Sequence, residues 1–300
     1  MSPAALREGP ARRPRVVATD LDGTLLRSDG TVSSRTRAVL AEVEAAGVEV
    51  VFVTARPPRW LGALTDLVGG HGRVICLGGA AVWDLGAGEA LDTCGFAPDA
   101  VAGLVGDLRA AVPGVALALE RIDGPVFDPW FPPGEPDLPA AVRAVPVEES
   151  LGTSGSTAPV GKLLAVSPAA LSSTRPGDVG HADGADDDAQ QQLFARVRDA
   201  VGERAHLAYS GAVGLAELLA PGVTKDAALA RWCARLEVDA EDVWAFGDMP
   251  NDLPMLAWAG RSFAVSNAHP QVLAAASDVV GHHDDDGVAT ALEDALAAIG

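Results

Sequence analysis

The stretch from Arg15 to Thr24 reads RVVATDLDGT and decides the fold of this chain. Residues 15–19 are predicted to form a buried strand, because they are a short apolar run bounded by polar residues. The strand leads directly into two acids, Asp20 and Asp22, which are followed by Gly and Thr. An isolated Asp-Gly pair would indicate only a solvated turn. Two acids spaced by one residue at the end of a buried strand indicate more than a turn.

Short apolar runs alternate with amphipathic stretches at both ends of the chain. Ser33 or Ser34 can cap a helix that ends near Gly47, and Val48–Thr54 follows as a second buried strand. Late in the chain we expect a helix at 224–236, a strand at 243–246, a helix from about 251, a strand at 262–265, and helices near 270 and 288. This pattern predicts an α/β protein with a doubly wound, Rossmann-like parallel-sheet core.

The middle of the chain has a different pattern of predicted elements and breaks. Residues 84–219 contain short strand candidates and helices separated by Pro-rich and Gly-rich breaks, so we expect an inserted α+β domain there and a core built from 15–83 and 220–300. Within the insertion, residues 167–188 are polar and acidic, which favours a mobile loop over a metal site. Residues 1–14 lack an apolar stretch long enough for a signal peptide and are expected to be a disordered leader.

Composition excludes several classes of protein. With 48% hydrophobic residues, a chain of 300 residues can bury a large core and is not disordered over most of its length. The net charge of −19 argues against a nucleic-acid partner. No window approaches the length of a membrane span. The three cysteines form no Cys-x-x-Cys pair, which favours a reducing, cytoplasmic location. An oligomeric partner cannot be read from the sequence.

A second strand also delivers acids to the same edge of the sheet. The strand at 243–246 is followed by Gly247 and Asp248, and Asn251 and Asp252 open the next helix. Helix capping explains one of these residues but not the convergence of several acids. In open α/β sheets, ligands bind outside the carboxyl ends of the strands. Carboxylates that meet there repel each other unless a hard cation lies between them, so the pattern predicts a Mg²⁺ site.

Four motifs, in this order along the chain, resemble the haloacid dehalogenase superfamily, and within it the Cof-type phosphatase branch with a large α+β cap (subfamily IIB). They are DLDGT from Asp20, Thr54 in VFVTARP, Lys225 in PGVTKDAAL, and GDMPND from Gly247. The tail SNAHPQVLAAASDVVGHHDDDGVA is also similar to this branch. Any one motif is a short pattern, but four in order at plausible spacing leave little room for chance.

The resemblance implies a phosphohydrolase that works through an aspartyl-phosphate intermediate. Asp20 would be the nucleophile, and Asp22 the general acid and then the base. Mg²⁺ would lie between Asp20, the backbone carbonyl of Asp22 and Asp248, with Asp252 behind them.

The resemblance also implies which residues contact the phosphate, namely Thr54, Arg56, Lys225 and Asn251, together with the nucleophile. Lys225 would lower the pKa of the nucleophile and offset charge in the transition state. Composition supports this role, because Lys162 and Lys225 are the only lysines of the chain. In a chain that otherwise uses Arg, a lysine is expected where a site needs a compact ammonium and not a planar guanidinium.

Asp22 also narrows the reaction class. Within the superfamily, dehalogenases and ion-pumping ATPases lack an acid at this position, whereas phosphatases and phosphomutases have one. We therefore expect a Mg²⁺-dependent phosphatase acting on a small organic phosphate monoester, such as a sugar phosphate or a phosphorylated cofactor. The alternatives are a phosphomutase or phosphotransferase of the same superfamily, and a non-catalytic protein that binds a phosphate ligand.

Two departures from the branch pattern concern the substrate. The usual Thr-Gly-Arg is Thr-Ala-Arg at 54–56, and the usual Asn-Gly-Ala is Gly-Gly-Ala at 78–80, so a substrate-facing amide is lost. A further pattern, His282 and His283 before three aspartates, invites a metal interpretation. Adjacent residues point in different directions, so a solvated loop is favoured there.

Overall fold

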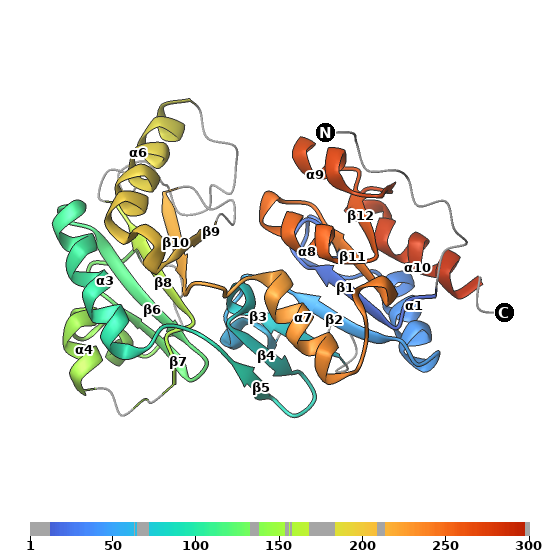
Figure 1. The fold of residues 1–300 in the computed structure, drawn as a ribbon, viewed down its shortest axis with the longest axis horizontal. Coiled ribbons are helices and arrows are strands. Elements are labelled where there is room, and N and C mark those ends of the chain that lie inside the picture. Colours follow the sequence, from blue (N-terminus) through green and yellow to red (C-terminus); the bar gives the residue numbers. More distant parts are fainter. Residues whose placement is uncertain are drawn as a thin grey trace. The chain divides into compact units, whose positions relative to one another are not determined.

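The protein is described from a computed structural model, which covers residues 13–62, 64, 72–132, 138–153, 156, 158–167, 184–208 and 214–297. The chain divides into two compact units, which Figure 1 shows as ribbons. The first unit combines Met1–Asp92 with Thr224–Gly300, and the second is Thr93–Val223. Each unit is built around its own sheet.

The first unit contains an eight-stranded sheet in the order β13-β12-β11-β1-β2-β3-β4-β5. The pairs from β13 to β3 are parallel, and β4 runs antiparallel to β3. The strand bounds are β1 (Val16–Asp20), β2 (Glu49–Val53), β3 (Arg73–Cys76), β4 (Ala81–Asp84), β5 (Glu89–Thr93), β11 (Val243–Gly247), β12 (Arg261–Val265) and β13 (Asp278–Val280). Neighbouring parallel strands need a crossover connection, and the helices of this unit lie in these connections.

Two groups of helices pack in this unit. α1 packs against α10, whereas α8 packs against both α7 and α9 (Figure 1). The bounds are α1 (Ser34–Ala45), α7 (Lys225–Arg235), α8 (Leu253–Trp258), α9 (Pro270–Ala275) and α10 (Gly287–Ala297). Short 3-10 helices are η1 (Pro58–Trp60), η2 (Leu77–Gly79), η5 (Ala240–Asp242), η6 (Pro250–Asp252) and η7 (His283–Asp285). The predicted α/β class with a doubly wound core is confirmed.

Local sequence signals place the elements that lead to the sheet edge. All five residues of β1 are buried, as its apolar run predicts, and the strand includes Asp20 as its last residue. Ser33 caps α1, its side chain accepting a hydrogen bond from the backbone N–H of Thr36. Thr224 caps α7 in the same way, through the N–H of Ala227. Lys225 is therefore the first residue of its helix.

The second unit contains a five-stranded antiparallel sheet in the order β7-β6-β8-β10-β9. Its strands are β6 (Ala116–Arg121), β7 (Gly124–Phe127), β8 (Lys162–Val166), β9 (His206–Ala208) and β10 (Leu215–Leu219). Its helices are α3 (Pro98–Ala111), α4 (Val147–Thr153), α6 (Gly184–Val201), η3 (Ala140–Arg143) and η4 (Gly202–Arg204). Because α3 packs against both α6 and α4, the unit has the α+β character expected of the insertion.

A buried aspartate organises one end of the second unit. Asp128 is fully buried and accepts hydrogen bonds from the backbone N–H groups of Leu117 (2.6 Å) and Val147 (3.1 Å). Arg109 donates to the same carboxylate at 2.8 Å and also pairs with Glu148. With these hydrogen bonds, the buried carboxylate of Asp128 has partners on its oxygens and connects α3, β6, β7 and α4.

The structure differs from the sequence-based expectation in two places. β4 and β5 extend the large sheet beyond residue 84, so the first unit continues to Asp92. Helix α6 begins at Gly184, inside the stretch 167–188 that was expected to be a loop. Packing of α6 against α3, which a local pattern does not reveal, accompanies this helix. Residues 1–12 of the expected leader and 168–183 of the expected loop lie outside the described residues.

Candidate active site

Two neighbouring parallel strands carry the central acids of the site. β1 pairs with β11, and Thr19 lies opposite Phe246 in the register. The chain then continues into Asp20 on one strand and, past Gly247, into Asp248 on the other. Both acids are buried although each is ionisable. The sheet therefore brings them to the same carboxyl edge, as the sequence predicts.

Lys225 joins two buried carboxylates at this edge. Its Nζ lies 2.6 Å from Oδ1 of Asp20 and 2.6 Å from Oδ1 of Asp252. The second oxygen of Asp252 accepts the backbone N–H groups of Asp248 (3.2 Å) and Met249 (3.1 Å). Asp252 is fully buried and satisfied by these partners. It is thus a fixed anchor between α7 and the turn after β11.

Asp20, Asp248 and Asp252 form a carboxylate cluster. Each offers one oxygen atom, and these atoms lie within 4.8 Å of one another. Thr24 donates its hydroxyl to Oδ1 of Asp248 at 2.9 Å. Gly23 has φ of 81°, and a Cβ there would lie 2.5 Å from Oδ2 of Asp248. The Gly of the motif is therefore required both by its left-handed backbone and by the close approach of this carboxylate.

The electrostatics of the cluster show a shortage of positive charge. Burial, reinforced by Asp252 and Asp248, raises the pKa of Asp20, while Lys225 opposes this shift. Burial and the nearby Asp252 raise the pKa of Asp248 to about 6. Burial works against the charge of Lys225, but Asp20 and Asp252 outweigh it and raise the lysine's pKa above its ordinary value. One ammonium thus faces three carboxylates in the described part of the chain.

The residues at this edge fit a hard divalent cation. Carboxylate oxygens are the ligands that Mg²⁺ prefers, and the cluster presents one from each of three acids. Within the described ranges, Oδ1 of Asn251 is buried and has no hydrogen-bond partner. A buried acceptor of this kind calls for a donor or a cation. The cluster can therefore bind a divalent metal.

Asp22 does not join the cluster. Its side chain is 57% exposed and forms an ion pair with Arg56. Nε of Arg56 donates to Oδ2 of Asp22 at 2.9 Å, and Nη2 donates to the other oxygen. This arrangement is a bidentate pair, which holds both side chains in one orientation. Two residues that the sequence assigns to separate roles are thus partners of each other.

Hydrogen bonds connect Thr54, which follows β2, to Arg56 and to Gly78, which follows β3. Thr54 is buried, and its hydroxyl accepts the backbone N–H of Arg56 at 3.1 Å. The backbone carbonyl of Thr54 accepts the N–H of Gly78 at 3.1 Å. Gly78 has φ of 68°, a left-handed conformation that Gly or Asn adopts readily. Gly78 therefore has a backbone conformation that Asn can also adopt, and it lacks the Asn side-chain amide.

The sequence analysis gave no role to two residues that support the cluster. Thr24 holds Asp248, and Asn267 donates from Nδ2 to the backbone carbonyl of Gly23 at 2.7 Å. Both lie in stretches that carry the resemblance, the DLDGT run and the SNAHP tail. Their position in those motifs is the sequence signal for both residues. Their hydrogen-bond partners could not be read from it, because those partners are distant in sequence.

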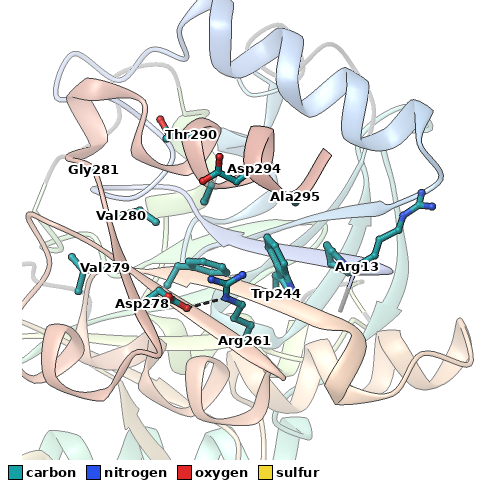
Figure 2. A pocket seen from close by; sticks show the side chains of 13 residues that line it. Arg13, Trp244, Arg261, Asp278, Val279, Val280, Gly281, Thr290, Asp294 and Ala295 are labelled. Carbon is teal, nitrogen blue, oxygen red and sulfur yellow. Dashed lines mark hydrogen bonds and ion pairs between the residues drawn. The ribbon is translucent and has the colours of Figure 1, made fainter. Parts of the chain in front are cut away.

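A separate cavity of about 500 Å³ lies at the other end of β11 and β12. Figure 2 shows Arg261 beside Trp244 in this cavity, paired with Asp278 at 2.9 Å. The guanidinium also lies over the rings of Trp244 and Phe263. None of the clustered acids lines it, so it is not part of the candidate active site.

The haloacid dehalogenase-like hydrolase family matches residues 17–124 and 182–292. The chain belongs to this family. The prediction of this superfamily from the four motifs is confirmed. The matched ranges include every residue of the carboxylate cluster and Lys225.

Relatives of this haloacid dehalogenase-like hydrolase include HMP-PP phosphatases. The HMP-PP phosphatase of Escherichia coli O157:H7 is 30% identical over 275 residues, which cover 89% of this chain and 90% of that protein. That of Cronobacter sakazakii is 38% identical over 107 residues, which cover 35% of this chain and only 39% of the relative. The expectation of a phosphatase enzyme of this superfamily agrees with these relatives and with the family match.

Solved structures share the fold. A haloacid dehalogenase-like hydrolase from Bacteroides thetaiotaomicron superposes with a TM-score of 0.68 at 23% identity, covering 93% of this chain and 98% of that one. A phosphatase of the same superfamily and organism gives a TM-score of 0.70 at 22% identity, with 98% and 99% covered. Across the described ranges, no helix is long and apolar enough to span a membrane.

Proposed function

We propose that the chain is a Mg²⁺-dependent phosphatase that hydrolyses a small organic phosphate monoester through an aspartyl-phosphate intermediate. The observation that carries the proposal is the buried cluster in which Lys225 joins Asp20 and Asp252 beside Asp248. A carboxylate fixed at the end of a strand, with an ammonium on one oxygen, is suited to attack an electrophile with the other. The family match and the phosphatase relatives support this reading.

The metal ligands in this proposal are Asp20, Asp248 and the backbone carbonyl of Asp22, with Asp252 supporting them from behind. Bound Mg²⁺ supplies positive charge that offsets the crowded carboxylates and the charge of the phosphoryl group. Asp252 is already fixed by Lys225 and two backbone N–H groups, so its role is to orient.

In the first step, an oxygen of Asp20 forms a bond to phosphorus as the ester P–O bond breaks. Asp22 donates a proton to the departing oxygen, which leaves as an alcohol. The Lys225 ammonium, Thr54 and the amide of Asn251 contact the phosphoryl oxygens and hold them in line. In the second step, water attacks the phosphorus, Asp22 accepts its proton, and Asp20 is released with inorganic phosphate.

Arg56 has to change partners during this cycle. A bidentate pair with Arg56 occupies both oxygens of Asp22, whereas the first step needs one of them free to face the departing oxygen. The phosphate of an incoming substrate is a competing anion for the same guanidinium. We therefore assign Arg56 to the substrate phosphate once the substrate is bound and to Asp22 before that.

The names of the relatives and the charge of the chain bear on the substrate class. HMP-PP is the substrate in the names of relatives, which makes it and other phosphorylated cofactors the first compounds to test. A nucleic-acid substrate is disfavoured by the net charge of −19. We assign substrate selection to the inserted unit, residues 93–223, because such units vary within a fold. A cytoplasmic location is consistent with the three cysteines, which form no disulfide.

The decisive experiment measures phosphate release from a panel of phosphate esters, including HMP-PP and sugar phosphates, with Mg²⁺ and with a chelator. Steady release without an acceptor supports the phosphatase. Release only when an acceptor sugar is phosphorylated would instead indicate a phosphomutase or phosphotransferase. Metal-dependent binding without turnover would indicate a binding protein and overturn the proposal. Asp20→Asn is the inactive control.

A further inference from the structure

The segment after the candidate nucleophile is held by a distant part of the chain. We call residues 281–286, which follow β13 and include η7, the clamp segment. It contacts residues 26–28, and Asn267 contacts Gly23 of the same turn. Gly23 and Thr24 in turn lie against Asp248. Neither the proposed Mg²⁺ site nor the proposed reaction gives this interaction a role.

Asn267 and His283 make the contacts nearest the cluster. Nδ2 of Asn267 donates to the backbone carbonyl of Gly23 at 2.7 Å, and its Oδ1 accepts the backbone N–H of His283 at 3.1 Å. Nδ1 of His283 lies 2.6 Å from the backbone carbonyl of Leu26. Because a carbonyl only accepts, Nδ1 must carry the hydrogen. The imidazole is thus oriented as a donor to the turn.

Two aspartates extend the same interaction along residues 27 and 28. Asp284 accepts the backbone N–H of Ser28 at 2.7 Å through Oδ1 and the hydroxyl of Ser28 at 2.7 Å through Oδ2. Asp286 accepts two hydrogen bonds from Arg27, at 2.8 and 3.2 Å. The clamp segment therefore contacts residues 26–28 at successive positions.

The clamp also accounts for the paired histidines without a metal. His282, His283 and Asp284 offer ligand atoms within 4.8 Å of one another. However, Asp284 already uses both oxygens on Ser28, and Nδ1 of His282 accepts the N–H of Asp284 at 3.2 Å. These polar atoms serve the loop, which favours a structural use of the motif over an ion.

The gripped segment is coupled to the cluster by close contacts. Gly23 leaves no room for a Cβ against Asp248, and Thr24 donates to the same carboxylate. A shift of residues 23 and 24 by a fraction of an ångström would therefore carry Asp248 with it. Groups that orient metal ligands in this way change affinity or activity by about 10-fold to 100-fold when they are removed.

We propose that Asn267 and His283 are positioning residues that hold the 23–26 turn so that Asp248 and the carbonyl of Asp22 face a common cation. The inference rests on the proposed function in taking that cation to be Mg²⁺. It predicts an effect on metal binding even though neither side chain is a ligand. It also predicts that the donor at Nδ1 of His283, 2.6 Å from the carbonyl of Leu26, matters more than Nε2, which lies 3.4 Å from the hydroxyl of Ser28.

The test compares His283→Asn, which keeps a donor at the δ position, with His283→Gln, which moves it. Asn267→Ala removes the contact to Gly23, and His206→Gln is the matched control, an exposed histidine of the second unit. Titration calorimetry with Mg²⁺ alone gives the dissociation constant of each full-length variant. Thermal unfolding in chelator and kcat with KM on the best ester complete the set.

We expect His283→Gln and Asn267→Ala to raise the Mg²⁺ dissociation constant by about tenfold or more, with kcat falling and KM for the ester little changed. His283→Asn and His206→Gln should stay within about twofold of the wild type. Equal Mg²⁺ affinity in His283→Gln and the wild type would overturn the clamp. Wild-type protein that binds Mg²⁺ but hydrolyses no ester would overturn the proposed function alone, and wild-type protein that binds no Mg²⁺ would overturn both.

Discussion

Replacing Lys225 by Met tests the electrostatic design of the carboxylate cluster directly. Met keeps most of the length of the side chain but removes the ammonium that lies 2.6 Å from both Asp20 and Asp252. Removing one partner of a buried ion pair costs about 3–5 kcal/mol. Asp252 keeps two backbone donors, and the pKa values of Asp20 and Asp248 are already raised, so protonation relieves part of the charge. We therefore expect a loss near the lower end, about 3 kcal/mol, in chelator.

Mg²⁺ should restore part of this loss, because it supplies the positive charge that the lysine no longer provides. At a concentration of about 100 times its dissociation constant, a ligand that binds only the folded state adds about 2.7 kcal/mol. At the same Mg²⁺ concentration, we expect the stabilisation by Mg²⁺ to be larger in Lys225→Met than in the wild type. The reason is that the ammonium of the wild type already occupies part of the cluster. Activity should nevertheless fall by about 100-fold to 1000-fold, since the variant lacks the ammonium that we propose contacts the phosphoryl group.

Lys162→Met is the matched control, because the chain has only these two lysines. Lys162 is also buried and pairs with Glu217 at 2.7 Å, but in the second unit. Urea unfolding of both variants, in chelator and in Mg²⁺, should show similar losses but an enhanced metal response only for Lys225→Met. Unchanged stability of Lys225→Met in chelator, or the same metal response in both variants, would refute the reasoning.

Four further outcomes follow from the geometry. Chelation should abolish phosphate release, and Mg²⁺ or Mn²⁺ should restore it; full turnover in excess chelator would remove the metal from the proposal. Asp20→Asn should remain folded and form no acid-stable labelled phosphoenzyme, and near-wild-type turnover would exclude it as nucleophile. Asp22→Asn should slow the single-turnover burst about 100-fold or more with an alkyl phosphate, whose alcohol needs a proton in order to leave. The burst with nitrophenyl phosphate should slow much less, because nitrophenol leaves readily as its anion. Equal losses with both substrates would count against a general acid. Arg109→Met should cost about 2–3 kcal/mol in urea unfolding, because Asp128 loses a charged partner, and a loss near zero would contradict this. Arg109 also lowers the pKa of Glu148, which therefore stabilises the fold above its ordinary pKa and loses this contribution as pH falls; the variant should lose less stability on acidification than the wild type.

Much of the core could be predicted because its signals are local. The buried run before Asp20, the Ser33 cap and the apolar run before Gly247 each specify one element within a few residues. Their alternation indicates a parallel sheet, and parallel strands bring their carboxyl ends to one edge. The convergence of Asp20 and Asp248 followed from this rule before any distance was known.

The boundaries of the insertion were harder to predict. β4 and β5 are short, and the addition of β4 to β3 and of β5 to β4 depends on neighbours that local patterns do not reveal. Likewise, the start of α6 lies in a polar, acidic stretch whose composition is typical of a loop. Composition indicates whether residues can be buried, but it does not show that a helix will pack against α3.

By itself, the sequence determined the superfamily, the parallel core of the sheet and the chemical type of each motif residue, because these depend on residue identity and order. Tertiary structure alone decided the strands β4 and β5 at the sheet edge and three pairings: Arg56 with Asp22, Lys225 with Asp252, and the 281–286 clamp with residues 26–28. Each of these three pairings joins positions 27 or more residues apart in the chain. Such contacts arise from how the elements pack, and packing is a property of the folded chain that no local pattern encodes.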